Sequence, residues 1–213
     1  MCPFVKAWHL IKRAPLVLLF LICAVPAGAQ QNFLIYPLPT ANSAPQAITP
    51  GPDGAMWFSE QNSNQIGRID NTGAITEYPV PTPGGKPLGI TSGSDGALWF
   101  AENGASKIGR ITTSGIVSEF PIGALTPFWI VTGSDGNLWF TTTFKQITLG
   151  KLTVSGAETS YGGPVSSDLC GLAAGSDGAL WDPTAAALQL CASIPPGISR
   201  TPPPGRWVCF AAI

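Results

Sequence analysis

The sequence is poor in charged residues and contains a single histidine, His9. Charged residues make up only 11% of the 213 positions, and no cluster of lysine and arginine occurs, which argues against nucleic acid as a partner. Helical periodicity is absent after residue 30. The 25 glycines and 21 prolines disfavour long helices and suit short strands joined by turns. Disorder requires low hydrophobicity, but 45% of the residues are hydrophobic, so we expect a folded domain.

The first 29 residues predict a secretory signal peptide. A basic start precedes the apolar run 16–22, and Ala27 and Ala29 are the small residues that a signal peptidase recognises, so cleavage is expected before Gln30. A membrane anchor is the alternative, but it would need a longer apolar run. We therefore expect a secreted or periplasmic protein without a stable membrane anchor after cleavage. Cleavage would also remove His9 and leave the mature protein without histidine.

The chain beyond the leader is acidic and has an odd number of cysteines. Eight basic residues stand against twelve acidic ones in this part, and the cysteines are Cys170, Cys191 and Cys209. One pair could form a disulfide, but the spacings match no metal site or disulfide framework. We interpret the three as incidental cysteines.

One phrase, G-x-D-G-x-L-W-F-x-E, recurs along the chain. Its copies occupy residues 51–60, 93–102, 133–142 and, in part, 175–181. Their first glycines are separated by 42, 40 and 42 residues, as the numbers show for Gly51, Gly93, Gly133 and Gly175. A second phrase, I-G-R-I or L-G-K-L, keeps the same period at 66–69, 108–111 and 149–152. Repeats of about forty residues are typical of β-propeller blades.

The chemistry within each unit predicts four short strands. Asp-Gly pairs supply the positive φ that tight hairpin turns require, and further Gly-containing turns separate the last two strands. We predict an all-β partial propeller over 30–182, followed by an irregular tail at 183–213. Its blades are expected at 45–79, 87–121 and 127–162, with half a blade at 168–182. A β-sandwich also has many short strands, but it does not require identical units at a fixed spacing.

Two repeated residue types allow a functional and a structural interpretation. A ladder of tryptophans could bind a ligand, but the same position in each blade is where neighbouring sheets pack, so we interpret them as core: Trp57, Trp99, Trp139 and Trp181. The Asp-Gly pairs could suggest calcium loops. They lack the further acidic ligands at short spacing that calcium requires, so turn chemistry is the stronger account.

These phrases resemble the virginiamycin B lyase (streptogramin lyase) family over about residues 33–181. The resemblance implies a propeller that has seven blades in the family, of which this chain holds about three and a half. It also implies a magnesium-dependent carbon–oxygen lyase that opens streptogramin B antibiotics by elimination at the ester linkage. Proton abstraction beside a carbonyl needs a base, and a cation stabilises the charge that develops.

The catalytic residues that the resemblance implies are missing here. An acid and a histidine belong to an E-P-H-G-I phrase at a blade start, and a carboxylate from a W-F-x-E phrase completes the site. At the histidine position this chain has Gln46, Leu88, Phe128 and Cys170. At the acid position it has Ala44, Lys86, Thr126 and Asp168. The W-F-x-E position holds Glu60, Glu102 and Thr142. We assign no catalytic, cofactor-binding or metal-binding residue in this chain, and we expect no bound cofactor and no activity.

The repeat stops abruptly at Trp181, where Asp182 and Pro183 replace the expected Phe-x-Glu. This change inside a strong motif suggests a frameshift or a premature stop. The segment 33–36 matches the outermost strand of a blade whose other strands should come from the far end of the chain. We therefore expect an open array with exposed sheet faces at both ends, prone to self-association.

Three functions remain open from the sequence. The first is a lyase of the streptogramin type, supported by the blade phrases and opposed by the absent histidine. The second is a non-catalytic exported propeller that binds a peptide, a glycan or a protein on one face, near Leu88, Phe128 and Trp129. The third is a truncated product without a function. The ligand itself is unknown.

Overall fold

The structure is a computed structural model that describes residues 34–142, 148–162, 171–184, 189–193 and 207–211. The predicted signal peptide and the strand residue Phe33 lie outside these ranges, as do Asp168 and Cys170. The chain divides into the units Met1–Ile35 and Tyr36–Ile213, and all the strands belong to the second. No helix in the described ranges is long and apolar enough to cross a membrane.

The three complete copies of the repeat each form one antiparallel four-stranded sheet, in which the strands follow one another in chain order. Blade 1 consists of β1 (Pro45–Pro50), β2 (Met56–Glu60), β3 (Gln65–Ile69) and β4 (Ile75–Pro79). Blade 2 consists of β5 (Pro87–Ser92), β6 (Leu98–Glu102), β7 (Lys107–Ile111) and β8 (Val117–Pro121). Blade 3 consists of β9 (Pro127–Thr132), β10 (Leu138–Thr142), β11 (Thr148–Leu152) and β12 (Glu158–Gly162).

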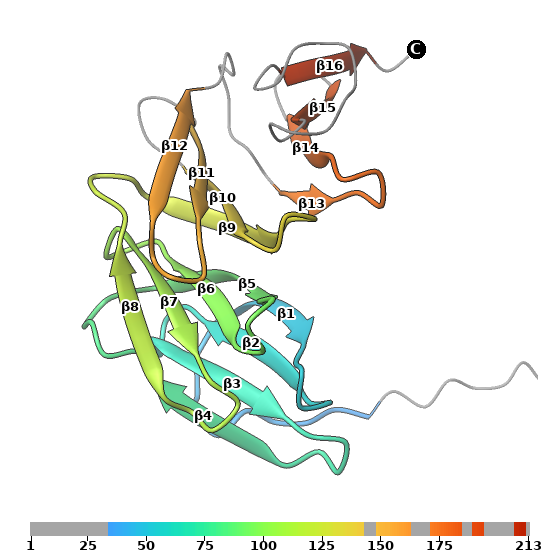
Figure 1. Cartoon of the computed structure of the whole chain (residues 1–213). Coiled ribbons are helices and arrows are strands. Elements are labelled where there is room, and N and C mark those ends of the chain that lie inside the picture. The colour runs from blue at the N-terminus through green and yellow to red at the C-terminus, as the bar shows by residue number, and fades with distance from the viewer. Residues whose placement is uncertain (1–33, 143–147, 163–170, 185–188, 194–206, 212–213) are drawn as a thin grey trace, which may run out of the picture. The chain divides into compact units, whose positions relative to one another are not determined.

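A fourth sheet of four strands follows blade 3, whereas the sequence predicted only half a blade at this place. It consists of β13 (Ala173–Ala174), β14 (Leu180–Thr184), β15 (Gln189–Ser193) and β16 (Trp207–Ala211), in that order. The prediction that 183–213 is irregular is therefore wrong for β15 and β16 (Figure 1). The repeat phrases are absent here, but strand pairing uses backbone groups, which any sequence except proline supplies. The predicted domain boundaries remain predictions.

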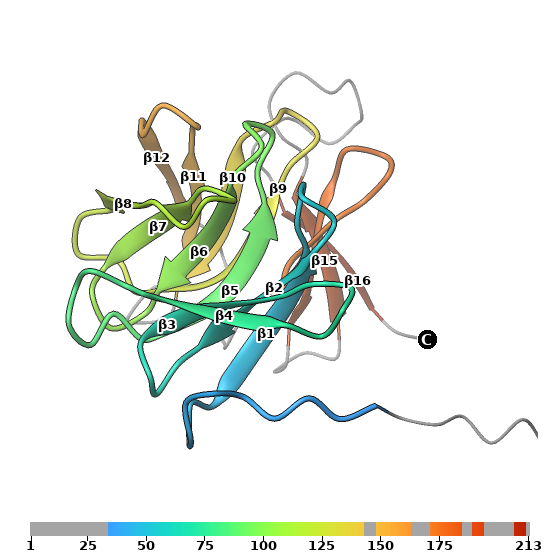
Figure 2. The ribbon, with the colours of Figure 1, turned by 90° about the horizontal axis from the view of Figure 1, so that it is seen from below.

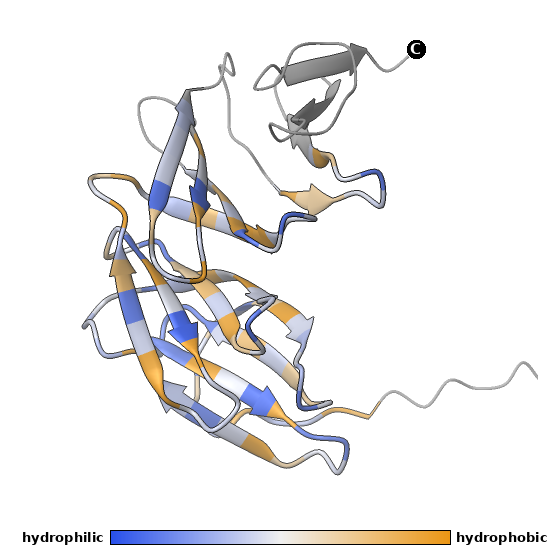
Figure 3. Ribbon diagram, viewed as in Figure 1, coloured by the Kyte–Doolittle hydropathy of each residue, from blue (hydrophilic) through white to orange (hydrophobic). Residues whose placement is uncertain are grey.

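The sheets succeed one another along the chain and contact their neighbours. The innermost strands of successive blades lie side by side, β1 with β5 and β5 with β9 (Figures 1 and 2). Hydrophobic and hydrophilic residues alternate along many of the strands (Figure 3), as expected for sheets that pack in layers. Within this unit the sheets are not closed into a ring. The open partial propeller that the sequence predicts is confirmed.

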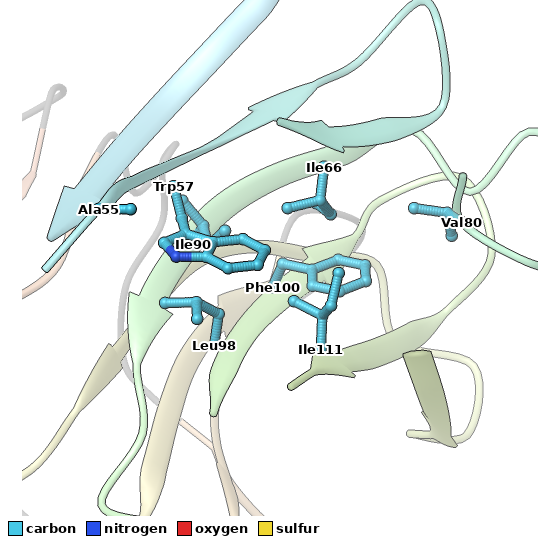
Figure 4. Close-up of a cluster of buried hydrophobic side chains, with 8 residues drawn as sticks. All are labelled: Ala55, Trp57, Ile66, Val80, Ile90, Leu98, Phe100 and Ile111. Carbon is cyan, nitrogen blue, oxygen red and sulfur yellow. The ribbon is translucent and has the colours of Figure 1, made fainter. Parts of the chain in front are cut away.

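The core lies between the sheets, where one face of each blade packs on the opposite face of the next. Trp57 and Ile66 of blade 1 meet Ile90, Phe100 and Ile111 of blade 2, as Figure 4 shows. The next interface repeats the arrangement, with Trp99 and Ile108 against the corresponding side chains of blade 3. The exposed fraction of Trp57, Trp99 and Trp139 is 0–1%. The prediction that the repeated tryptophans form the core is confirmed for these three, whereas Trp181, the fourth, is partly exposed.

The aspartate of each Asp-Gly turn also fixes the tryptophan that follows it. In blade 1 the Trp57 Nε1–H donates to Asp53 Oδ1 at 2.9 Å, and the Arg68 Nε–H donates to Asp53 Oδ2 at 2.7 Å. The Arg68 guanidinium lies over the Trp57 ring. The Tyr78 ring stacks on the same Trp57 ring, and the two ring centroids are 5.6 Å apart. The other two blades repeat the set with Asp95, Trp99 and Arg110 and with Asp135, Trp139 and Lys151. One carboxylate oxygen thus holds the core tryptophan, and the other holds the cation that lies over its ring.

The glycine of the I-G-R-I phrase makes room for the phenylalanine of the W-F phrase. A Cβ atom added at Gly67 would lie 2.2 Å from the Phe58 ring, and one at Gly109 would lie 2.1 Å from the Phe100 ring. Side chains cannot approach this closely, so each phenylalanine can lie flat across its own sheet only if the neighbouring strand carries glycine. The two phrases of the repeat therefore depend on each other.

We expect Trp99→Ala to lower the free energy of unfolding by roughly 3–5 kcal/mol, since it leaves a large cavity between blades 2 and 3. Urea unfolding monitored by circular dichroism measures this loss. Ile116, which is 66% exposed, provides the control, and Ile116→Ala should change stability by less than about 0.5 kcal/mol. Equal effects of the two substitutions would contradict the assignment of Trp99 to the core.

Candidate functional site

The positions at which the resemblance implies catalytic residues lie along one edge of the sheets, where the innermost strands begin and the second strands end. The register pairs Pro45 with Glu60 and Pro87 with Glu102. In blade 3 it pairs Pro127 with Thr142. The blade-start phrase and the W-F-x-E phrase therefore lie side by side in each blade. We call this the strand-start edge.

The side chains at the histidine position of this edge differ from blade to blade. Gln46 is exposed, Leu88 is 7% exposed and Phe128 is partly buried. An amide, an isobutyl group and a phenyl ring cannot accept a proton at neutral pH. The described strand starts therefore supply no general base at this position.

The backbone at the acid position has an unusual conformation. Ala44 has φ of 53° and Lys86 has φ of 50°, values in the left-handed region that residues other than glycine rarely adopt. The Lys86 N–H donates to Asn64 Oδ1 of blade 1 at 3.0 Å, which helps to hold this conformation. The side chain of Lys86 is exposed to solvent. The turn before the strand is thus formed in both blades, although neither presents a carboxylate.

Glu102 is the most perturbed group at this edge. Its exposed fraction is 0%, and neither carboxylate oxygen has a hydrogen-bond partner among the described residues. Burial, with a smaller contribution from the negative charge of Glu119, raises the pKa of Glu102 to about 7. The carboxylate lies beside Gly85 of the linker, where a Cβ atom would be 3.1 Å from Oε2. Burial therefore favours the protonated form of Glu102 as the pH approaches neutrality.

Glu60, the matching residue of blade 1, is also fully buried, but its carboxylate accepts a hydrogen bond. The Ser63 hydroxyl donates to Glu60 Oε2 at 2.7 Å, whereas Oε1 has no partner in the described part of the chain. Burial raises the pKa of Glu60, and the Ser63 hydrogen bond opposes this shift. In blade 3 the position is taken by Thr142, which is 1% exposed.

A second carboxylate near Glu102 links blade 2 to the preceding linker. Thr82 donates its backbone N–H to Glu119 Oε1 at 2.8 Å and its hydroxyl to Glu119 Oε2 at 2.7 Å. Lys107 Nζ forms an ion pair with the same carboxylate at 2.7 Å. Burial alone would raise the pKa of Glu119, but the hydrogen bonds from Lys107 and Thr82 outweigh it and lower the pKa. We call the contact between Thr82 and Glu119 the threonine–glutamate clasp.

The clasp recurs in blade 1, where Thr40 donates to Glu77 Oε1 at 3.0 Å and to Oε2 at 2.6 Å. In both blades the partners are 37 residues apart. Blade 1 has Gln65 in place of Lys107, and blade 3 has Ser160 in place of the glutamate. The sequence analysis missed the clasp, although the 42-residue interval between Thr40 and Thr82 was a signal that could have found it.

The residues described here do not fit the magnesium ion that the resemblance implies. Glu60 and Glu102 belong to different blades, and no three His, Cys, Asp or Glu side chains in the described ranges gather as a metal site. Magnesium is usually bound by carboxylates together with waters or substrate. A single buried carboxyl group with a raised pKa is a poor ligand, because it must lose its proton before it can bind the ion.

A family model matches most of the chain beyond its first residues. The model is that of the virginiamycin B lyase family, and it matches residues 27–181. The match ends at Trp181, where the repeated phrase also ends.

Solved structures of similar proteins carry related names. Selenomethionine-substituted virginiamycin B lyase from Staphylococcus aureus is 37% identical with a TM-score of 0.75, over 83% of this chain and 58% of that chain. A catalytically inactive variant from the same organism, with quinupristin, is 37% identical with a TM-score of 0.73, over 82% and 57%. A streptogramin B lyase is 34% identical with a TM-score of 0.73, over 84% and 58%. This chain thus spans less than two thirds of the length of each.

The buried carboxyl group of Glu102 should make stability depend on pH. Its pKa is 4.5 when exposed and about 7 in the folded chain, so between these values the folded state holds a proton that the unfolded state has released. The free energy of unfolding should therefore fall as pH rises through this window, by up to about 3 kcal/mol, and then level off. Urea unfolding at a series of pH values from about 4 to about 8.5 measures the slope of the free energy of unfolding against pH.

Glu102→Gln should remove this part of the slope and make the protein more stable than the wild type at about pH 8. The matched control is Glu158→Gln, since Glu158 is exposed, and that variant should keep the slope of the wild type. A wild-type slope in Glu102→Gln would show that another group titrates.

Proposed function

This chain belongs to the virginiamycin B lyase family, and we propose that it is an exported, lyase-like propeller protein whose described blades do not open the streptogramin B ring. Export rests on the leader pattern of residues 1–29. The family activity proposed for a complete site is a magnesium-dependent elimination, which requires a base and a cation at one place.

One observation supports the proposal that the catalytic site is incomplete. The described strand starts present Gln46, Leu88 and Phe128, where the family phrase has histidine. The remaining candidate base, Glu102, is buried without a partner and has a pKa of about 7. A group that is fully enclosed cannot reach a substrate proton without a rearrangement of the linker beside it.

A second function, binding without catalysis, is favoured by an aromatic pair at the same edge. Phe128 and Trp129 are partly exposed and meet edge to face, with ring centroids 5.9 Å apart. The indole N–H of Trp129 has no hydrogen-bond partner among the described residues. An apolar ligand would suit this pair, because the partly exposed rings offer apolar surface. The Trp129 Nε1 atom is itself buried, so the rings rather than the N–H would make the contact.

Quinupristin, which accompanies one relative of 37% identity, is a suitable probe for both functions. We expect no opening of its ring above the buffer rate when the purified protein and magnesium are added, as measured by liquid chromatography over a time course. The Staphylococcus aureus enzyme is the positive control. Magnesium-dependent ring opening by this chain would contradict the first proposal.

Equilibrium dialysis of the same mixture measures binding. Retention of intact quinupristin that is lost in Trp129→Ala and kept in Ile116→Ala would support the binding function. No retention at any concentration would contradict it for this ligand.

A further inference from the structure

Blade 2 has a positive charge at its threonine–glutamate clasp, and blade 1 does not. The ammonium group of Lys107 donates to Thr82 Oγ1 at 2.6 Å and to Glu119 Oε2 at 2.7 Å. Blade 1 repeats the clasp, but it has Gln65 in place of Lys107. A glutamine amide carries no charge, so the clasp of blade 1 lacks the cation that holds its counterpart in blade 2.

Oxygen atoms around Gln65 are left without hydrogen-bond donors. Gln65 Oε1 and Glu60 Oε1 are both buried, and neither has a partner among the described residues. The register pairs these two residues directly, where β2 ends and β3 begins. Glu77 of β4 pairs with Gly67, two residues beyond Gln65. Residues two apart on a strand point to the same face of the sheet, so the Glu77 carboxylate is on the face that carries Gln65 and Glu60.

The two carboxylates of this group disfavour each other's charge. Glu60 is 0% exposed. Burial raises the pKa of Glu60, the Ser63 hydroxyl lowers it, and the negative charge of Glu77 raises it again. Buried acceptors without donors cost free energy, so a positive charge among these oxygens would stabilise the folded blade. We call Thr40, Glu60, Gln65 and Glu77 the blade 1 oxygen cluster.

The atoms that the cluster offers are those that calcium prefers. They are the oxygens of two carboxylates, one amide and one hydroxyl. Calcium takes about six to eight oxygen ligands in flexible geometry, whereas magnesium demands a near-ideal octahedron. One divalent ion also balances the charge of two carboxylates. Gln65 and Glu77 are only half-buried, so water can reach this side of the cluster and complete the shell of the ion.

We propose that blade 1 binds a calcium ion at this cluster, in the place that the Lys107 ammonium group takes in blade 2. The cluster has two acidic side chains rather than three, so we expect a dissociation constant of roughly 0.1–1 mM, as in extracellular calcium modules. Gln65 and Glu77 lie on β3 and β4, whereas the histidine position of the family phrase lies on the innermost strand. The site is therefore separate from the magnesium site that the resemblance implies, and it does not depend on lyase chemistry.

Equilibrium dialysis of the whole chain against radioactive calcium, after treatment with EDTA and at constant ionic strength, tests the proposal. We expect one bound ion per chain, with magnesium competing at least about tenfold more weakly. Calcium should also raise the urea concentration at the midpoint of unfolding, because an ion that binds only the folded state stabilises it. Sodium chloride at the same ionic strength should not raise this midpoint.

Two substitutions of Gln65 should change binding in opposite directions. Gln65→Lys gives blade 1 the arrangement of blade 2, so it should lose calcium binding and yet unfold at a urea concentration no lower than the calcium-free wild type. Gln65→Glu adds a third carboxylate, so it should bind calcium about tenfold more tightly. Ile116→Lys is the control, because it adds the same charge as Gln65→Lys at a residue that is 66% exposed, and it should bind like the wild type.

Three results would overturn the proposal. The first is a wild type that binds no calcium well above the expected dissociation constant, which would show that the Gln65 amide turns its NH₂ group toward the carboxylates or that a proton takes the place of the ion. The second is equal binding by Gln65→Lys and the wild type, which would place the ion elsewhere on the chain. The third is equal competition by magnesium, which would contradict the assignment to calcium.

Discussion

The structure depends on one contact, in which the tryptophan side of a blade packs on the isoleucine and phenylalanine side of the next. This contact contains the largest of the fully buried side chains in the described part of the chain, among them Trp57 and Phe100. The other parts of the repeat serve it. Aspartate and arginine fix the tryptophan ring, and the glycine of the I-G-R-I phrase lets the phenylalanine lie flat. Because the blades have no separate cores, the stability of each depends on its neighbours.

The sequence predicted the part of the fold that the repeat encodes. The spacing of Gly51, Gly93 and Gly133 predicted the blades, and the tryptophans of the three complete blades are core, because each lies where neighbouring sheets pack. Strands β15 and β16 were not predicted, since their pairing uses backbone groups and leaves no phrase to recognise. Their presence means that the end of the family phrases at Trp181 is not the end of regular structure.

The candidate site was predictable in its positions but not in its electrostatics. Overlaying the repeats identifies Leu88 and Phe128 as residues without acid–base chemistry, because that depends only on residue type. The raised pKa of Glu102 depends on the linker that encloses it and on the nearby Glu119, and both are features of the folded chain. At the W-F-x-E position, Glu60 of blade 1 accepts a hydrogen bond from Ser63, whereas Glu102 of blade 2 has no hydrogen-bond partner among the described residues.

The threonine–glutamate clasp shows where one repeat can be separated from the next. Thr82 lies before the first strand of blade 2, while its partner Glu119 lies in the last strand. The smallest segment that contains both ends of the clasp therefore begins in the linker. Gene duplication or deletion would preserve the hydrogen bonds of blade 2 only if recombination occurred upstream of the Thr82 codon. A crossover between Thr82 and the start of β5 would separate the partly buried carboxylate of Glu119 from its donor, so the segment that keeps its own hydrogen bonds is offset from the visible blade.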